Sequence, residues 1–87
     1  MNQWRWKLDF SVENDIKRLD PAIRRRIIDK LDWLATNCGI VKHEPLTGEY
    51  RDYFRLRVGK IRLLYKLNWE DKVVIFVYID SRDKVYK

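Results

Sequence analysis

The stretch from Tyr53 to Tyr65, YFRLRVGKIRLLY, decides the fold of this chain. Its residues alternate with a period of two on both sides of Gly59 and Lys60, which predicts two antiparallel strands joined by a two-residue turn. Glycine in the first turn position favours a type II′ turn, where that residue needs a positive φ. We therefore expect a β-hairpin at the centre of the molecule.

The hairpin is expected to gather arginines on one face of the sheet. One face would carry Phe54, Leu56, Val58, Ile61, Leu63, Tyr65 and Leu67, and the other Tyr53, Arg55, Arg57 and Arg62. Like charges placed side by side in a sheet repel one another. Two interpretations follow: the arginines form pairs with acidic side chains of neighbouring segments, or they bind a polyanion.

Composition limits the classes of protein to consider. The 87 residues predict a single domain, 1–87, and the formal net charge of +6 predicts attraction to nucleic acid or to an acidic protein. Cys38 is the only cysteine, so neither a disulfide framework nor a metal cluster is expected. With no secretory stretch and no apolar run of about 20 residues, we expect a soluble, cytoplasmic protein without a membrane partner.

The residues before the hairpin predict one strand and two helices. Trp4, Trp6, Leu8 and Phe10 alternate with polar residues, which indicates a strand with one buried face. Ser11 is the expected N-cap of a short helix with Val12, Ile16 and Leu19 as its apolar positions. The second helix is expected to begin at Asp20 and Pro21, to end at about Cys38, and to have Gly39 as its stop signal.

The second helix also carries residues outside its apolar stripe. The stripe consists of Ile23, Ile27, Leu31, Leu34 and Ala35. Trp33 lies away from it, near Arg26 and Lys30. A large aromatic side chain on a basic helical face either packs under a loop or contacts a partner, and we expect Trp33 and Arg26 to bind a partner protein.

The remaining segments complete an α+β domain. Residues 40–52 read as a connector, and its lone His43 has no second metal-type ligand nearby. Lys72 to Ile79, KVVIFVYI, is nearly all apolar and is expected to lie well inside the sheet. The predicted order is β-α-α-β-β-β, a two-layer fold with a mainly antiparallel twisted sheet, a helical hairpin on its apolar face, and the other face open.

The open face favours RNA over other ligands. The sequence has no Gly-rich phosphate loop, no HExxH or CxxC motif, and no carboxylate pair that stands out as a general acid and base. No metal or cofactor is expected. Arginines bind phosphate bidentately and tyrosine rings stack on unpaired bases. We therefore expect single-stranded RNA to bind a face carrying Tyr53, Arg55, Arg57, Arg62, Arg82 and Tyr86.

The same residues resemble a known family. Leu46-Thr47-Gly48, the block from Tyr53 to Gly59, Arg62 and Tyr65, and the closing Arg82, Val85 and Tyr86 resemble the signature of the RelE/ParE superfamily of toxin–antitoxin toxins. The final 20 residues look like archaeal RelE members. The resemblance covers nearly the whole chain and implies the RelE-like fold, a cognate antitoxin, and one of two activities. RelE-like members are ribosome-dependent endoribonucleases that cut mRNA, whereas ParE-like members inhibit DNA gyrase.

The resemblance also assigns roles to individual residues. It implies that Arg62, Arg82 and Tyr86 are catalytic, and that Arg55 and Arg57 bind the substrate. Tyr53 is expected to bind the substrate because tyrosine rings stack on unpaired bases. This chain departs from many nuclease members, because arginines replace the usual Lys or His near the attacking hydroxyl and Ser81 stands where a His often precedes the closing arginine. Arginine is a poor general base. An mRNA interferase is expected, and a gyrase inhibitor or a catalytically silent binding module is the alternative.

Overall fold

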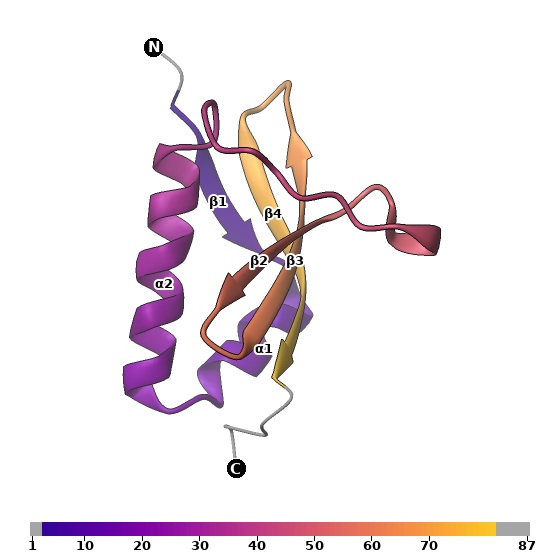
Figure 1. Ribbon diagram of the computed structural model, residues 1–87. Helices are drawn as coiled ribbons and strands as arrows, with labels where there is room; N and C mark the ends of the chain where they lie inside the picture. Colours follow the sequence, from indigo (N-terminus) through magenta and orange to yellow (C-terminus); the bar gives the residue numbers. More distant parts are fainter. Residues whose placement is uncertain (1–2, 82–87) are drawn as a thin grey trace.

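Two helices pack on one face of a four-stranded twisted sheet in the computed structural model, which describes residues 3–81 (Figure 1). This confirms the predicted α+β class and the order of the elements. The elements are β1 (Arg5–Leu8), α1 (Phe10–Lys17), α2 (Pro21–Thr36), the short 3₁₀ helix η1 (Gly48–Tyr50), β2 (Phe54–Val58), β3 (Ile61–Asn68) and β4 (Val73–Ser81).

The sheet has the strand order β1-β4-β3-β2. Strands β2, β3 and β4 are antiparallel neighbours, while β1 runs parallel to β4. The apolar strand β4 therefore lies in the interior of the sheet, as predicted. The central hairpin is also confirmed: Val58 pairs with Ile61, and Gly59 between them has a φ of 62°.

A β-bulge in β4 changes which of its residues face the helices. Leu64 of β3 pairs with Tyr78 and the next residue of β3, Tyr65, pairs with Phe76, so Val77 has no partner in the ladder. Before the bulge, even-numbered residues such as Phe76 are buried. After it, Ile79 is buried, and Tyr78 is 53% exposed on the opposite face.

The core lies between the helices and the inner face of the sheet. Its buried members come from every layer: Val12, Ile16, Leu19, Ile27, Leu31, Leu34, Leu56, Leu63, Tyr65, Val74 and Phe76. Burial of this apolar surface is the dominant favourable term in folding. A hydrogen bond of 2.7 Å from Trp6 Nε1 to Asp32 Oδ1 joins β1 to α2.

Three predicted boundaries are wrong. The first strand ends at Leu8, and Phe10, 74% exposed, opens α1 with Asp9 as the N-cap; Ser11 lies inside the first turn and contacts Asp9 Oδ2 at 3.2 Å. Helix α2 ends at Thr36 and not near Cys38, because the side chain of Asn37 donates to the carbonyl of Trp33 and caps the helix. Gly39 does not have the positive φ of a glycine cap.

The beginning of α2 matches its prediction. Pro21 occupies the first turn, and the Asp20 side chain accepts a hydrogen bond of 3.2 Å from the backbone of Ala22. This bond satisfies one of the backbone donors that a helix leaves unpaired at its N-terminus.

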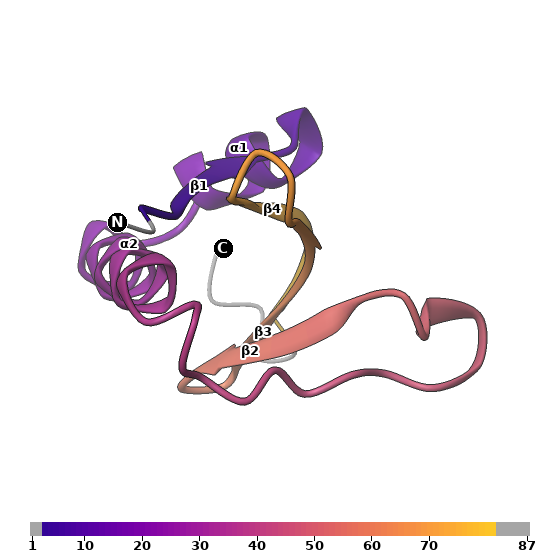
Figure 2. The same cartoon turned by 90° about the horizontal axis from the view of Figure 1, so that it is seen from above.

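The connector before the hairpin is more ordered than the sequence indicated. The backbone of Leu46 donates to the carbonyl of Tyr53, and an isolated bridge joins Pro45 to Phe54. Between these contacts the chain forms a loop, residues 46–53, that contains η1 and projects from the body of the domain (Figures 1 and 2). We call it the projecting loop.

Candidate nucleic-acid interface

The outer face of the sheet, turned away from the helices, brings the predicted arginines together. Arg57 of β2 lies directly opposite Arg62 of β3, and Arg55 lies opposite Leu64. The register of β4 adds Tyr78 opposite Leu64 and Asp80 opposite Arg62. Directly paired residues of antiparallel strands share a face. The prediction that Arg55, Arg57 and Arg62 share a face is therefore confirmed.

Two of the three arginines have acidic partners. Arg62 Nη2 lies 2.9 Å from Asp80 Oδ2, and Arg55 Nη2 lies 3.1 Å from Glu44 Oε1. Within residues 3–81, Arg57 is exposed and forms no ion pair. Solvent-accessible ion pairs contribute only about 0–1 kcal/mol. A phosphate group can therefore compete for the paired arginines, and Arg57 offers its charge directly.

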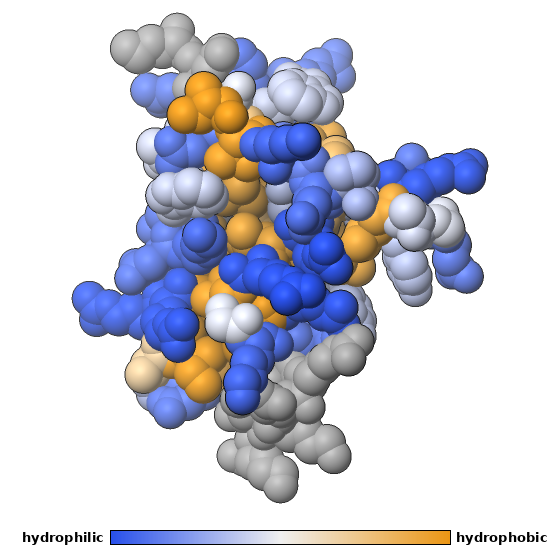
Figure 3. Space-filling model, viewed as in Figure 1, coloured by the Kyte–Doolittle hydropathy of each residue, from blue (hydrophilic) through white to orange (hydrophobic). Residues whose placement is uncertain are grey.

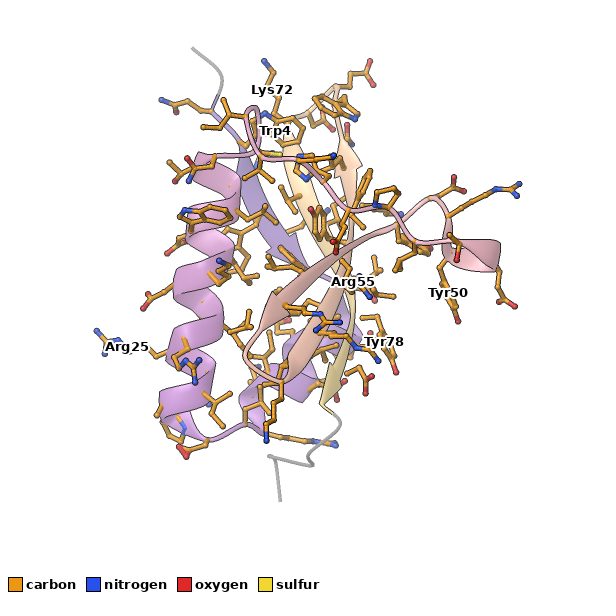
Figure 4. All side chains as sticks on the ribbon, in the orientation of Figure 1. Trp4, Arg25, Tyr50, Arg55, Lys72 and Tyr78 are labelled. Carbon is orange, nitrogen blue, oxygen red and sulfur yellow. The ribbon has the colours of Figure 1, made fainter. Side chains whose placement is uncertain are left out.

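Two of the hollows that indent this face have contrasting linings, one cationic and one aromatic. One, of about 280 Å³, is lined by Arg57, Gly59, Lys60 and Arg62. The other, of about 480 Å³, lies between the projecting loop and strands β3 and β4; its lining is Tyr50, Tyr53, Arg62, Leu64, Val77, Tyr78 and Asp80. Figure 4 shows Tyr50 on the projecting loop and Tyr78 beside the sheet. Arg62 borders both hollows.

Sequence reasoning missed several residues of these hollows, among them Lys60, Tyr50 and Tyr78. Lys60 was assigned only to the turn, Tyr50 only to the connector, and Tyr78 to an apolar strand without alternation. The bulge at Val77, which turns Tyr78 outward, leaves no signal in an all-apolar strand. Arg82 and Tyr86 lie outside the described residues, so their catalytic roles stay predictions.

His43 joins the connector to the core. Its Nε2 lies 3.0 Å from the carbonyl oxygen of Cys38, and its Nδ1 lies 2.7 Å from the hydroxyl of Tyr65. A carbonyl only accepts hydrogen bonds, so in neutral His43 Nε2 donates to it and Nδ1 accepts from the Tyr65 O–H. Burial raises the pKa of the Cys38 thiol, and burial, with smaller contributions from Cys38 and Glu44, raises the pKa of Tyr65.

A second surface lies between α2 and β2. Trp33 is 45% exposed, and Lys30 Nζ lies 4.3 Å from its ring centroid. Both residues line a groove of about 490 Å³ whose opposite wall includes Arg55 and Arg57. Arg26 lines a smaller hollow of about 310 Å³ beside Gly59. We call the two together the α2–β2 groove; Figure 3 shows apolar residues between α2 and β2, with hydrophilic residues on both sides.

The part of the chain that the structure describes offers neither a metal centre nor a membrane-spanning helix. Residues 3–81 contain no group of three or more His, Cys, Asp and Glu side chains placed to hold a metal ion. In the same range, neither helix has the length and apolar character to cross a membrane.

Comparison with known families adds to this geometry. The sequence profile of the ParE toxin of type II toxin–antitoxin systems, parDE, matches residues 7–86. The chain belongs to this family. Its resemblance to the RelE/ParE superfamily is thereby confirmed, and the protein is a toxin of a toxin–antitoxin module.

Individual relatives of this toxin carry RelE names. A curated Methanocaldococcus jannaschii toxin, RelE1, is 28% identical over an alignment 95 residues long. The alignment covers 92% of this chain and 98% of the relative. The archaeal RelE–RelB complex of Pyrococcus horikoshii matches with a TM-score of 0.73 and 27% identity, over 94% of this chain and 98% of the other.

A further solved structure shares the fold of the toxin at lower identity. A chain of the RelBE2 toxin–antitoxin complex of Mycobacterium tuberculosis matches with a TM-score of 0.81 and 23% identity, over 92% of this chain and 99% of the other. The RelE-like architecture predicted from the sequence is therefore confirmed.

Proposed function

We propose that this toxin is a ribosome-dependent endoribonuclease that cuts mRNA in the ribosomal A site. The observation that carries the proposal is the pairing of Arg57 directly opposite Arg62 on the outer face. Like charges directly opposite each other destabilise a sheet, and an anion bound by both guanidinium groups would offset this repulsion. The repeated phosphates of an RNA strand are such anions, and arginine matches their geometry bidentately.

The arginines suit one part of the cleavage chemistry. Attack of the neighbouring 2′-hydroxyl on the phosphate places negative charge on the equatorial oxygens, and fixed cations aimed at that charge lower the barrier. Arg57 and Arg62 supply two such cations across one strand pair. Arg82 and Tyr86 are proposed to complete the site, as the family resemblance implies.

Among residues 3–81, the outer face offers no obvious agent to remove the proton from the 2′-hydroxyl. The only histidine of the chain, His43, is hydrogen-bonded to Tyr65 and Cys38. Asp80, the one carboxylate among the residues lining the two hollows, is paired with Arg62. We propose that the reaction depends on a substrate geometry that the ribosome imposes, with the 2′-hydroxyl held in line with its phosphate.

A gyrase inhibitor is the second candidate. Two observations favour it: the family profile carries the ParE name, and neither hollow of the outer face is lined by histidine. On this alternative the outer arginines would bind an acidic protein surface instead of RNA.

Primer extension on mRNA distinguishes the two candidates. The wild-type protein is added to ribosomes programmed with a defined codon in the A site, and to the same mRNA without ribosomes. We expect clear cutting in the A site and slow or no cutting of naked mRNA. Rapid cleavage of the naked strand would disprove the ribosome requirement. Absence of cleavage on both substrates, with inhibited supercoiling by gyrase, would establish the alternative.

We also propose that a cognate antitoxin neutralises this cytoplasmic toxin by binding along the α2–β2 groove. Both solved structures described above are complexes of a toxin with its antitoxin. The groove has Trp33 and Leu34 on one wall and cationic residues along its margins. An amphipathic acidic segment would bury its apolar side chains there, and the net charge of +6 would accelerate its approach.

A further inference from the structure

The outer face of the sheet holds a second feature besides its charge. We propose that the hollow bounded by Tyr50, Tyr53 and Tyr78, which we call the tyrosine hollow, binds one unpaired nucleobase of the RNA strand beside Arg62. This inference deepens the proposed function, on which it rests, by assigning a base-binding site that the resemblance does not supply.

The tyrosine hollow exposes aromatic surface that a small protein would ordinarily bury. Tyr50 is 50% exposed and Tyr78 is 53% exposed, and both line the same space of about 480 Å³, together with Tyr53 and Leu64. Every nucleobase has a flat π-face, so a pair of accessible tyrosine rings accepts bases of different identity. The chemistry of the lining therefore fits a base better than a charged group.

The backbone holds the two sides of this hollow in place. On one side, the backbone of Tyr53 donates to the carbonyl of Tyr50 over 2.9 Å, and their ring centroids lie 6.2 Å apart with an interplanar angle of 38°. The hydrogen bond from Leu46 to Tyr53 closes the projecting loop at its base. On the other side, the bulge at Val77 directs Tyr78 outward from the interior strand β4.

Charge next to the tyrosine hollow places a phosphate at its margin. Arg62 lines this hollow and, together with Arg55, an adjoining one of about 160 Å³ that also contacts Tyr78. A nucleotide whose base lies between the tyrosine rings would thus have cations within reach of its phosphate. An acidic peptide would use the arginines but would have no need of the exposed rings, which favours RNA as the occupant.

Fluorescence anisotropy with two matched strands tests the proposal. The probes are a labelled hexa-adenylate RNA and the same ribose-phosphate strand with all six bases absent. We expect Tyr78→Ala to weaken binding of hexa-adenylate about 5- to 150-fold, the range for loss of one base–aromatic stack, and to leave binding of the base-free strand unchanged. Tyr78→Phe keeps the ring and should bind both strands as the wild type does.

Two controls separate stacking from charge and from folding. Phe10→Ala removes an even more exposed aromatic ring outside the hollow and should change neither affinity. Arg57→Ala removes a cation and should weaken the binding of both strands. Equal effects of Tyr78→Ala on the two strands, or no effect on either, would overturn the base-binding site. Failure of the wild type to bind either strand would overturn it as well.

The cleavage assay keeps this proposal distinct from the proposed function. If the wild type cuts mRNA in the A site while Tyr78→Ala binds hexa-adenylate normally, the nuclease assignment stands and the base-binding site is refuted. If the protein cuts neither substrate but shows base-dependent binding through Tyr78, the base-binding site stands and the nuclease assignment is refuted.

Discussion

The hydroxyl of Tyr65 and Nδ1 of His43 lie 2.7 Å apart, and this hydrogen bond connects strand β3 to the segment that follows α2. The other ring nitrogen of His43 reaches the carbonyl of Cys38 at 3.0 Å. The imidazole also packs beside Phe54 and Tyr65, with centroid distances of 5.4 and 5.7 Å. One loop side chain thus joins three segments that are distant in the sequence.

Removal of the Tyr65 hydroxyl should destabilise the fold. Tyr65→Phe leaves the acceptor nitrogen of His43 without its donor in a partly buried position, which costs about 1–3 kcal/mol of unfolding free energy. His43→Ala should cost more, because both hydrogen bonds and the ring contacts are lost. Urea denaturation measures both, and Tyr78→Phe, at an exposed ring, serves as the control. Equal stability of wild type and Tyr65→Phe would contradict this account.

The same residue should make the fold sensitive to alkaline pH. Burial raises the pKa of Tyr65 above its ordinary value of 10.0, so above that pH the folded protein retains a proton that the unfolded chain releases. Titration of Tyr65 should therefore leave the free energy of unfolding unchanged below pH 10 and should lower it as the pH rises further. The measurement is the difference between wild type and Tyr65→Phe in denaturation from pH 8 to 11. A constant difference across this range would show that Tyr65 does not titrate differently on folding.

Arg62→Ala should remove activity without unfolding the protein. Loss of one donor to the transition state typically lowers the rate by about 10²–10³, whereas breaking the partly exposed pair with Asp80 should change stability by no more than about 1 kcal/mol. Single-turnover cleavage on programmed ribosomes gives the rate. Arg25→Ala, at an exposed arginine of α2 that points away from the sheet (Figure 4), is the matched control. An Arg62→Ala protein that cuts at the normal rate would rule out the assignment.

Trp33→Ala should weaken binding of the cognate antitoxin with little change in its salt dependence. Trp33 contributes apolar surface to the α2–β2 groove, and truncation of an aromatic residue at the centre of an interface often costs 2 kcal/mol or more, about 30-fold. Dissociation constants across a salt series provide the measurement. Arg26→Ala should instead reduce the salt dependence. Unchanged affinity of the Trp33 variant would show that this side chain is structural.

Much of the fold could be predicted because its decisive segments have a clear period. The alternation around Gly59 fixed the hairpin, its turn and the face of each arginine, and the Asp20-Pro21 pair marked the start of α2 correctly. The errors arose where a local signal competed with a neighbouring one. Phe10 continued the alternation of β1, yet Asp9 begins a helix there, and Asn37 capped α2 before Gly39 was reached.

The candidate site was less predictable than the fold because it depends on contacts between distant segments. Nothing near His43 in the sequence indicates that Tyr65, 22 residues later, donates a hydrogen bond to it. The acidic partners of Arg55 and Arg62 were likewise expected as one of two alternatives, and only the register identified Glu44 and Asp80. Tyr78 was not predicted as a site residue because a run of apolar residues does not indicate which side chains point to which face of the sheet.

The bulge in β4 makes strand register, and not only side-chain identity, a determinant of the binding surface. If the bulge were lost with Val77 still present, Val77 would pair with Leu64, and Tyr78 and Asp80 would then follow Val74 and Phe76 toward the helices. A carboxylate would enter the apolar interior, and the sheet would lose its outward tyrosine at the same time. Homologous toxins with the same strand sequence length but no bulge would therefore present different outer faces, whereas a relative that lacks only the bulged residue would keep the same one. Sequence alignments of such relatives should be anchored on the ladder partners of β3.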